Sequence, residues 1–334
     1  MSKYITRKLI NTDKKKYEYY TSDKKLITNK ETLEKIYKIY IAPAYNDVKI
    51  YLNNKKLLAT GLDSKGRTQY IYSEHGKKLR EIKKYCQLIV LSNNISKLQT
   101  KINNDLSMTK YTKNKIIALI LRIMDICNFR CGNKKYEELY GSHGLTTLHK
   151  KHIIITENEV EIDFIGKKGV VNNCIINDNE NIQELIKSVY KLSSKDDPYL
   201  FSINYKNKHI KVSIGDLNKY LEKFNISIKN LRTWNANILF LKNFRDELLN
   251  NKDKDKELTK TIKKKLMKEA IQKTAISLHH TPTICKNSYI YKNILENIEL
   301  NNKIVNKLLV KNSLIENILK DLLRNKDMKN CNVN

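Results

Sequence analysis

Acidic residues are scarce in this chain of 334 residues: 35 Asp and Glu stand against 64 Lys and Arg, which leaves a formal net charge of +29. An AT-rich coding sequence would explain why Lys, Asn, Ile and Tyr are all abundant, but it would not explain the shortage of acids. Codon bias is therefore excluded as the whole cause. A charge of this sign predicts a polyanionic partner, DNA or RNA, because scattered cations neutralise phosphates.

Long apolar runs and paired cysteines are also missing. No stretch has the length of a membrane span and no signal-peptide pattern is present, so no membrane partner is expected. The six cysteines form no C-x-x-C pair, and Cys127 and Cys131 have no His at metal-ligand spacing. We therefore expect no metal site, and a soluble protein with reduced thiols in a reducing compartment. Its 40% apolar content excludes a disordered polycation.

Arginine is rare among the basic residues. Where Lys serves for plain positive charge, a retained Arg can mark a need for planar, two-pronged hydrogen bonding. This gives a weak indication for each of the eight arginines, which are Arg7, Arg67, Arg80, Arg122, Arg130, Arg232, Arg245 and Arg324.

The hydrophobic pattern changes once along the chain, and it predicts an α+β protein of two domains. Short alternating runs at 4–10, 17–20, 47–52 and 68–72, with one helical segment at 31–40, predict a β-rich domain over 1–77. Helical periods dominate 78–334, and Gly76, with the two lysines that follow it, is suited to a hinge. Three β-branched runs at 151–156, 160–165 and 170–176 predict a small antiparallel sheet inside the helical domain. The last eight residues read as a loose tail.

The segment GLDSKGRT (61–68) has the glycine spacing of a P-loop, but Arg67 replaces the Lys and the following QYIY alternates like a strand. ATP binding is not expected there.

Two tyrosines stand close together in HHTPTICKNSYIY (279–291). Thr281 and Pro282 predict a helix start, and on a continuous helix Ile284 and Tyr291 would join one apolar stripe. Tyr289 would then lie about 200° around the helix axis from Tyr291, on a basic and polar face. It is either an ordinary surface residue or a phenol presented to a phosphate.

Five motifs occur together in the order and spacing of the small poxvirus-type type IB DNA topoisomerases, which this chain resembles over nearly its whole length. They are D-S-K-G-R-x-Q-Y-x-Y (63–72), F-R-x-G-x-x-K-Y (129–136), F-x-G-K (164–167), L-R-T (231–233) and H-T-P-x-I-x-K-x-x-Y (280–289).

The resemblance implies the chemistry of that family, in which a tyrosine attacks a DNA phosphodiester, forms a 3′-phosphotyrosyl link, allows rotation and reseals the strand. It makes Tyr289 the nucleophile, with Arg130, Arg232 and His280 on the scissile phosphate and Lys167 as the general acid. His279 falls one position out of register. Preorganised donors suit the charge that builds on a phosphodiester under attack, without ATP or a metal ion.

The resemblance also implies contacts to double-stranded DNA. The matching positions are Lys65, Arg67, Gln69, Tyr70, Tyr72, Arg80, Lys135, Tyr136 and Asn237. It further implies a monomer that closes around the duplex, a preference for a pyrimidine-rich CCCTT-like site, and a place in the virion and the infected host cell. Asn133, where a basic residue is expected, and Trp234, where Tyr is expected, depart from the pattern and put the site preference in doubt.

Alternatives remain at this stage. Taken singly, Arg130 could be a helix-terminal cation, Arg232 could pair with an acid, Lys167 could be a solvated lysine and His280 could merely precede a cap. A tyrosine recombinase shares the chemistry, although Lys229 stands where recombinases place a His. A basic DNA-binding protein without catalysis is the third reading.

Overall fold

The computed structural model describes residues 4–11, 13, 16–251, 258–310, 313–324 and 331. The chain divides into two compact units, Met1–Lys84 and Tyr85–Asn334. The first is built on a β-sheet and the second is mainly helical, so the predicted α+β class is confirmed. The predicted tail lies outside the described residues apart from Cys331.

An antiparallel sheet forms the first unit, in the order β2-β1-β3-β4-β5. Its core consists of Tyr19, Ile36, Val48, Ile50 and Ala59. The sequence missed β4, whose buried positions are the small residues Ala59 and Gly61, both poor strand formers. The elements are β1 (Ile5–Asn11), β2 (Lys16–Thr21), α1 (Lys30–Tyr37), β3 (Asn46–Ile50), β4 (Leu57–Leu62) and β5 (Thr68–Tyr72).

Helix α2 (Glu74–Ser107) runs without a break through the place where the sequence predicted a hinge. Gly76 lies inside this helix, and a Cβ there would stand 2.2 Å from the carbonyl oxygen of Lys56. The glycine therefore permits close packing of the helix against the β3–β4 turn, and the expectation of a hinge at Gly76 was wrong.

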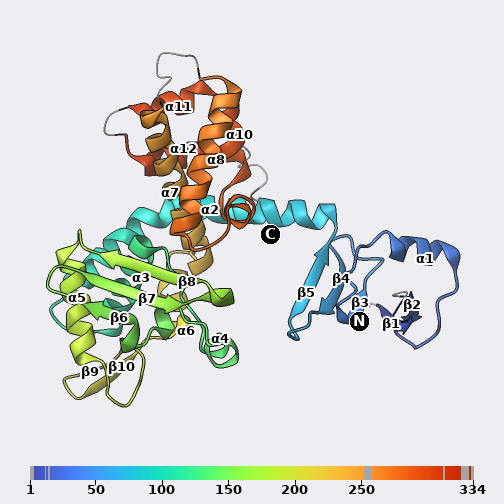
Figure 1. Ribbon diagram of the computed structural model, residues 1–334, viewed down its shortest axis with the longest axis horizontal. Coiled ribbons are helices and arrows are strands. Elements are labelled where there is room, and N and C mark those ends of the chain that lie inside the picture. Colours follow the sequence, from blue (N-terminus) through green and yellow to red (C-terminus); the bar gives the residue numbers. More distant parts are fainter. Residues whose placement is uncertain are drawn as a thin grey trace. The chain divides into compact units, whose positions relative to one another are not determined.

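The second unit contains the rest of the secondary structure (Figure 1). Its helices are α3 (Lys113–Cys127), α4 (Lys134–Tyr140), α5 (Glu180–Leu192), α6 (Ile214–Glu222), α7 (Ile228–Asn250), α8 (Lys260–Ser277), α9 (Pro282–Ile284), α10 (Lys292–Leu300), α11 (Asn302–Leu309) and α12 (Ile315–Arg324). Its strands are β6 (Ile153–Ile155), β7 (Val160–Ile165), β8 (Val171–Ile176), β9 (Ser202–Tyr205) and β10 (Lys208–Lys211). Short turns of 3₁₀ or π helix are η1 (Leu145–Thr147), η2 (Lys150–His152), η3 (Lys167–Gly169) and η4 (Cys285–Tyr289).

The predicted antiparallel sheet is present, in the order β6-β7-β8. Alternation explains it, because Val160, Ile162 and Phe164 face the core while Asp163 and Ile165 are exposed. The sequence missed the β9–β10 hairpin, whose four-residue strands are too short to show a period.

Helices surround the core of the second unit. Helix α3 is buried on almost every side and ends at Asn128, which adopts the left-handed conformation with φ 55°. Helix α7 buries Trp234, Phe240 and Phe244, and it packs against α8, α11 and α12, seen beside it in Figure 1. Among the described residues no helix is both long and apolar enough to cross a membrane.

Four of the six cysteines are paired, Cys86 with Cys331 and Cys127 with Cys174, while Cys131 and Cys285 are free and buried. The expectation that all thiols are reduced is therefore wrong for these four. The partners lie 245 and 47 residues apart in sequence, so no local spacing pattern could reveal them.

We predict that two thiols, Cys131 and Cys285, react with iodoacetamide when the purified protein is unfolded in denaturant without a reductant. All six should react after reduction, because the other four are held as disulfides. Peptide mass spectrometry gives the sites. Labelling of six thiols without reductant would contradict the pairing.

Candidate active site

Helix α7 carries Arg232 into the interior, where its side chain is 6% exposed. The helix begins after Ser227, whose hydroxyl accepts from the backbone N–H of Asn230 at 3.2 Å. One terminal nitrogen of Arg232 donates to the carbonyl of Asn128 and the other donates to that of Leu278 at 2.8 Å. The guanidinium is thus held between the end of α3 and the end of α8, and its Nε is buried without a partner among the described residues.

The segment after α8 is not the single helix that the sequence predicted. Thr281 caps a turn of three residues, α9, which passes into the π turn η4; Ile290 is then extended before α10 begins. Ile284 is 39% exposed, so the predicted apolar stripe through it was also wrong. A π turn inside a helical segment is frequent at functional sites, and here it ends on Tyr289.

Tyr289 lies against the imidazole and guanidinium groups that the resemblance had assigned to one phosphate. Its ring stacks on His280, with centroids 4.8 Å apart, and the Arg232 Cζ atom is 5.5 Å from the ring centroid. Burial alone would raise the pKa of the Tyr289 phenol. The charges and hydrogen bonding of Arg232 and Arg130 outweigh that effect and hold the pKa below its ordinary value.

His280 presents a second unpartnered nitrogen at the same place. Its Nδ1 lies 3.3 Å from the carbonyl oxygen of Thr281, while Nε2 is buried with no partner among the described residues. Burial, followed by the charge of Arg232, lowers the pKa of His280 to about 4. Two buried nitrogens that lack partners, on Arg232 and His280, mark a place for an anionic ligand beside Tyr289.

Arg130 follows the end of α3 and reaches the same group of residues. Its backbone carbonyl accepts from Leu145 N at 2.9 Å, and a Cβ on Gly144 would stand 2.6 Å from that carbonyl oxygen and 2.4 Å from Gly132 N. Gly132 itself has φ 79°, a conformation that favours glycine. The backbone around Arg130 is therefore fixed by two glycines in close contact.

Asn237 is a residue whose role the sequence did not show. It was predicted to contact DNA, but it is 1% exposed and its amide is engaged within the protein. The side chain donates to the carbonyl of Tyr289 at 2.9 Å and accepts from Tyr291 N at 2.9 Å. It thus fixes the backbone on both sides of Ile290. Tyr291 stacks on Tyr85, with centroids 4.7 Å apart.

Lys167 is placed differently from the other four predicted catalytic residues. It is exposed in η3, at the turn between β7 and β8, and within the described residues it forms no hydrogen bond or ring contact with Tyr289, His280 or either arginine. The turn itself is well defined, because Gly166 N donates to the carbonyl of Val170 at 2.8 Å and Gly166 packs on Asn172.

His279 packs beside the site without entering it. Its ring lies 5.2 Å from that of Phe129 by centroids, and its Nε2 is 3.4 Å from the carbonyl oxygen of Cys127. The family register, in which His279 falls one position before His280, gives it no part in the reaction.

In the first unit, Asp63 organises three of the six residues predicted to contact DNA there. Its carboxylate accepts from Lys65 N at 3.0 Å, Arg67 Nε at 2.8 Å and Gln69 Nε2 at 2.8 Å. The side-chain hydrogen bond from Arg67 holds the pKa of Asp63 far below its usual range. No helix follows this turn, so the rejection of a P-loop is confirmed.

The predicted aromatic contacts of the first unit share one face of β5. Tyr70 and Tyr72 stack with centroids 6.2 Å apart, and the Arg80 guanidinium lies 4.3 Å from the Tyr72 centroid. Tyr70 is 56% exposed.

Helix α4 presents Lys135 and Tyr136 to solvent in the second unit. Asn133, which departed from the expected basic residue, caps this helix by accepting from Lys135 N at 2.9 Å.

A tyrosine beside two arginines and a histidine, in a helical unit with a three-stranded sheet, is the arrangement that the resemblance to type IB topoisomerases implied. Residues 73–313 match the family model "Eukaryotic DNA topoisomerase I, catalytic core", and residues 16–63 match "Bacterial DNA topoisomerase IB, N-terminal domain". The chain belongs to the type IB DNA topoisomerases.

Its viral relatives confirm the resemblance to the poxvirus type. The DNA topoisomerase 1B of Acanthamoeba polyphaga mimivirus is 32% identical over 284 residues, 83% of each chain. The DNA topoisomerase 1B of vaccinia virus (strain Copenhagen) is 29% identical over 245 residues, 73% of each chain. The DNA topoisomerase I of monkeypox virus is 30% identical over 244 residues, again 73% of each chain.

We predict that His280 titrates with a midpoint of about 4 in the free protein, because its imidazole is buried beside Arg232. Between that value and about 6.5, the unfolded chain then binds more protons at this residue, so its contribution makes stability increase with pH in that window. Nitrogen-15 NMR of the imidazoles measures the midpoint, and His280→Asn identifies the signal. A midpoint near 6.5 would contradict the burial.

We predict that Asn237→Ala loosens the backbone around Tyr289, because Tyr291 N loses its acceptor. The free energy of unfolding should fall by about 1–3 kcal/mol, and hydrogen exchange at the Tyr291 amide should accelerate by roughly tenfold or more. Asn243→Ala is the matched control on α7, since Asn243 bonds to Thr274 at 3.0 Å instead. Equal exchange in both variants would remove the positioning role.

Proposed function

We propose that this protein relaxes supercoiled DNA by cutting and resealing one strand through Tyr289, without ATP or a metal ion. The observation that carries the proposal is the pair of unpartnered buried nitrogens, Arg232 Nε and His280 Nε2, beside a phenol whose pKa is lowered. Membership of the type IB topoisomerases supports the reaction class.

In the cleavage step, the Tyr289 oxygen attacks the phosphorus and the bond from phosphorus to the 5′ oxygen breaks. The products are a 3′-phosphotyrosyl link and a free 5′ hydroxyl, and resealing is the reverse exchange. The two guanidiniums favour loss of the phenolic proton. Arg130, Arg232 and His280 would then donate to the non-bridging oxygens, where negative charge develops.

The 5′ oxygen needs a proton as it leaves, and we assign this to Lys167 on the strength of the family pattern. Its place on an ordered, exposed turn is compatible with reaching a phosphate once DNA is bound, whereas catalytic contacts are often long before substrate binds. The assignment therefore requires an approach of the β7–β8 turn that the DNA itself induces.

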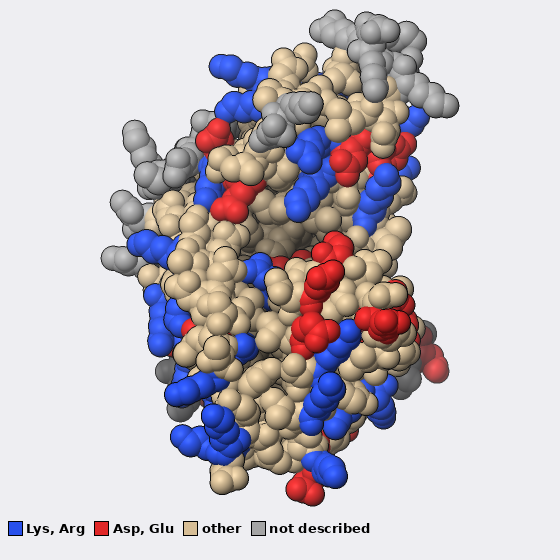
Figure 2. Space-filling view, turned by 90° about the vertical axis from the view of Figure 1, so that its left-hand side faces the viewer, with Lys and Arg blue, Asp and Glu red and all other residues tan. Residues whose placement is uncertain are grey.

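Double-stranded DNA is the proposed partner, held by a monomer that closes around it. On the face shown in Figure 2, Lys and Arg side chains are spread over much of the surface and acidic ones gather in a few groups. Such a distribution suits phosphate contacts along a duplex. The proposed DNA contacts are the predicted residues whose side chains are exposed or partly exposed, namely Lys65, Arg67, Gln69, Tyr70, Tyr72, Arg80, Lys135 and Tyr136.

We also propose a preference for a pyrimidine-rich CCCTT-like site, and action in the virion and the infected host cell. The viral origin of the relatives supports the cellular setting. Against the recombinase alternative, Lys229 lies one turn before Arg232 in α7 where a His is expected, and the N-terminal unit is a β-sheet that matches a topoisomerase model.

We predict that the wild-type protein forms a covalent adduct on a nicked duplex containing CCCTT, seen on a denaturing gel, and that Tyr289→Phe forms none. Arg130→Lys and Arg232→Lys should each lower the single-turnover cleavage rate by roughly 10²–10³-fold, because a charge remains but the forked donor is lost. Relaxation of a supercoiled plasmid in EDTA without ATP tests the overall reaction.

Tyr291→Phe is the matched control for the nucleophile, because Tyr291 stacks on Tyr85 and lies only two residues away. It should keep the adduct. An adduct in Tyr289→Phe, with the linked peptide mapped to Tyr291, would overturn the assignment of the nucleophile.

A further inference from the structure

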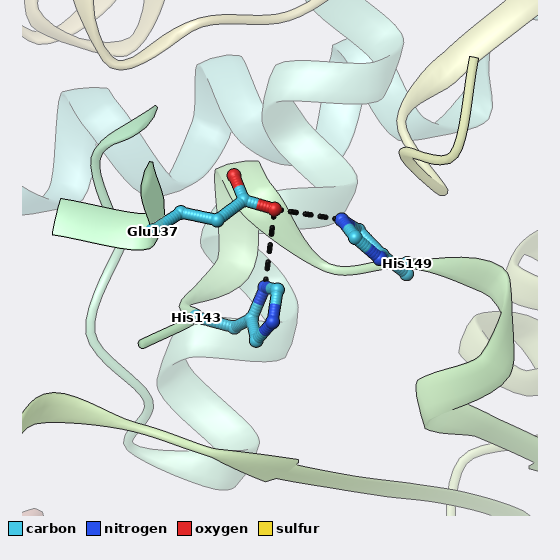
Figure 3. A group of neighbouring side chains, drawn as sticks. All are labelled: Glu137, His143 and His149. Atoms are coloured by element: carbon cyan, nitrogen blue, oxygen red, sulfur yellow. Dashed lines mark hydrogen bonds and ion pairs between the residues drawn. The ribbon is translucent and has the colours of Figure 1, made fainter. Parts of the chain in front are cut away.

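Three side chains converge in the second unit, none of them assigned to the reaction. Glu137 extends from α4, His143 follows that helix, and His149 precedes η2 (Figure 3). Glu137 Oε1 lies 2.7 Å from His149 Nε2 and 3.4 Å from His143 Nδ1. One ligand atom from each residue lies within 4.8 Å of the others.

These side chains are shielded from solvent, with exposed fractions of 13% for Glu137, 13% for His143 and 18% for His149. The second oxygen of Glu137 accepts from the Tyr199 hydroxyl at 2.8 Å. This bond orients the carboxylate so that Oε1 faces the two imidazoles. Such support from a neighbouring hydroxyl is the arrangement that holds ligating carboxylates in metal sites.

We propose that Glu137, His143 and His149 bind a zinc ion. Zinc bonds of about 2.0–2.2 Å in a tetrahedron require ligand atoms roughly 3.3 Å apart. The 2.7 Å separation needs a small opening, as the ion replaces the proton between Glu137 and His149, and the 3.4 Å separation already fits. The two imidazole nitrogens lie within 4.8 Å of each other, so they move closer as the ion binds.

The donor set selects among cations. Two imidazoles and one carboxylate suit zinc and its neighbours among the transition metals, whereas Ca²⁺ and Mg²⁺ prefer oxygen ligands throughout. One bond opposes the site, because His143 Nδ1 also lies 2.9 Å from the carbonyl oxygen of Thr147. Coordination through Nδ1 breaks that contact, which sets a limit on affinity.

The ion would act on structure and not on the reacting phosphate. It would join α4, which bears Lys135 and Tyr136, to the segment before β6 and, through Tyr199, to the start of β9. The same segment contacts the backbone of Arg130 through Leu145 N at 2.9 Å. The proposal is independent of the proposed function, since it concerns residues outside the catalytic group.

The test is titration of the metal-free full-length protein with Zn²⁺, followed by calorimetry, and with Co²⁺, followed by its visible spectrum. We expect one ion per chain, a tetrahedral Co²⁺ spectrum, and a rise in the midpoint of thermal unfolding of roughly 5 °C in excess Zn²⁺. His143→Gln and His149→Gln should each weaken binding roughly 100-fold, and Tyr199→Phe roughly tenfold.

His75→Gln is the matched control, because His75 is exposed and lies outside the cluster. It should bind zinc as the wild type does. X-ray absorption of the zinc-loaded wild type keeps the test decisive if a variant fails to fold, since it should show nitrogen and oxygen neighbours with an imidazole signature. Sulfur at about 2.3 Å, binding weaker than millimolar, or wild-type affinity in His149→Gln would overturn the site and leave a hydrogen-bonded cluster only.

Discussion

The positive charges of two guanidinium groups offset the free-energy cost of ionising a buried phenol. The structure around Tyr289 holds these two groups in place. Burial raises the pKa of Tyr289, whereas Arg232 and Arg130 lower it and prevail. The balance depends on Arg232 staying in the interior, where its terminal nitrogens donate to the ends of α3 and α8. It also depends on the Arg130 backbone, which is fixed by the contact of Gly132 with Gly144. The charge of Arg232 is thus anchored by main-chain carbonyls, and among the described residues neither arginine forms an ion pair with an acid that would cancel its charge.

The phenol in turn is held by its own backbone. Asn237 bonds to the main chain on either side of Ile290, and the π turn η4 brings Tyr289 onto the His280 ring. A regular helix through 282–298 would have separated the two tyrosines by rotation alone. The irregular geometry instead lets Tyr291 stack on Tyr85 while Tyr289 remains in the anion-binding group. The amide of one buried side chain therefore supports both the irregular backbone and the placement of Tyr289.

Sequence patterns predicted the elements whose signal is local. The β-branched runs at 151–156, 160–165 and 170–176 predicted the sheet that contains β7. The end of the regular helix after Ile284 could not be predicted from local sequence. The backbone that follows it is held by Asn237, which is 52 and 54 residues away from the backbone groups it binds. The disulfides have the same character. The family motifs correctly grouped Arg130, Arg232, His280 and Tyr289 from the sequence alone. The same motifs could not show that Asn237 is buried and not a surface residue. No spacing pattern marked the grouping of Glu137 with His143 and His149, because helix α4, the loop after it and the start of η2 each supply one of the three.

The carboxylate of Asp63 holds Arg67 and Gln69 in place before any duplex arrives. Long side chains that are already confined lose little rotamer entropy when they meet a partner, so more of each new hydrogen bond appears as affinity. If Arg67 and Gln69 contact DNA as proposed, the same acid would place a negative charge next to a polyanion and would therefore disfavour loose, phosphate-only encounters. A turn built in this way would bind more tightly to a duplex whose groove edges match the positions of its hydrogen-bond donors. It would bind weakly to a duplex that offers only phosphate charge.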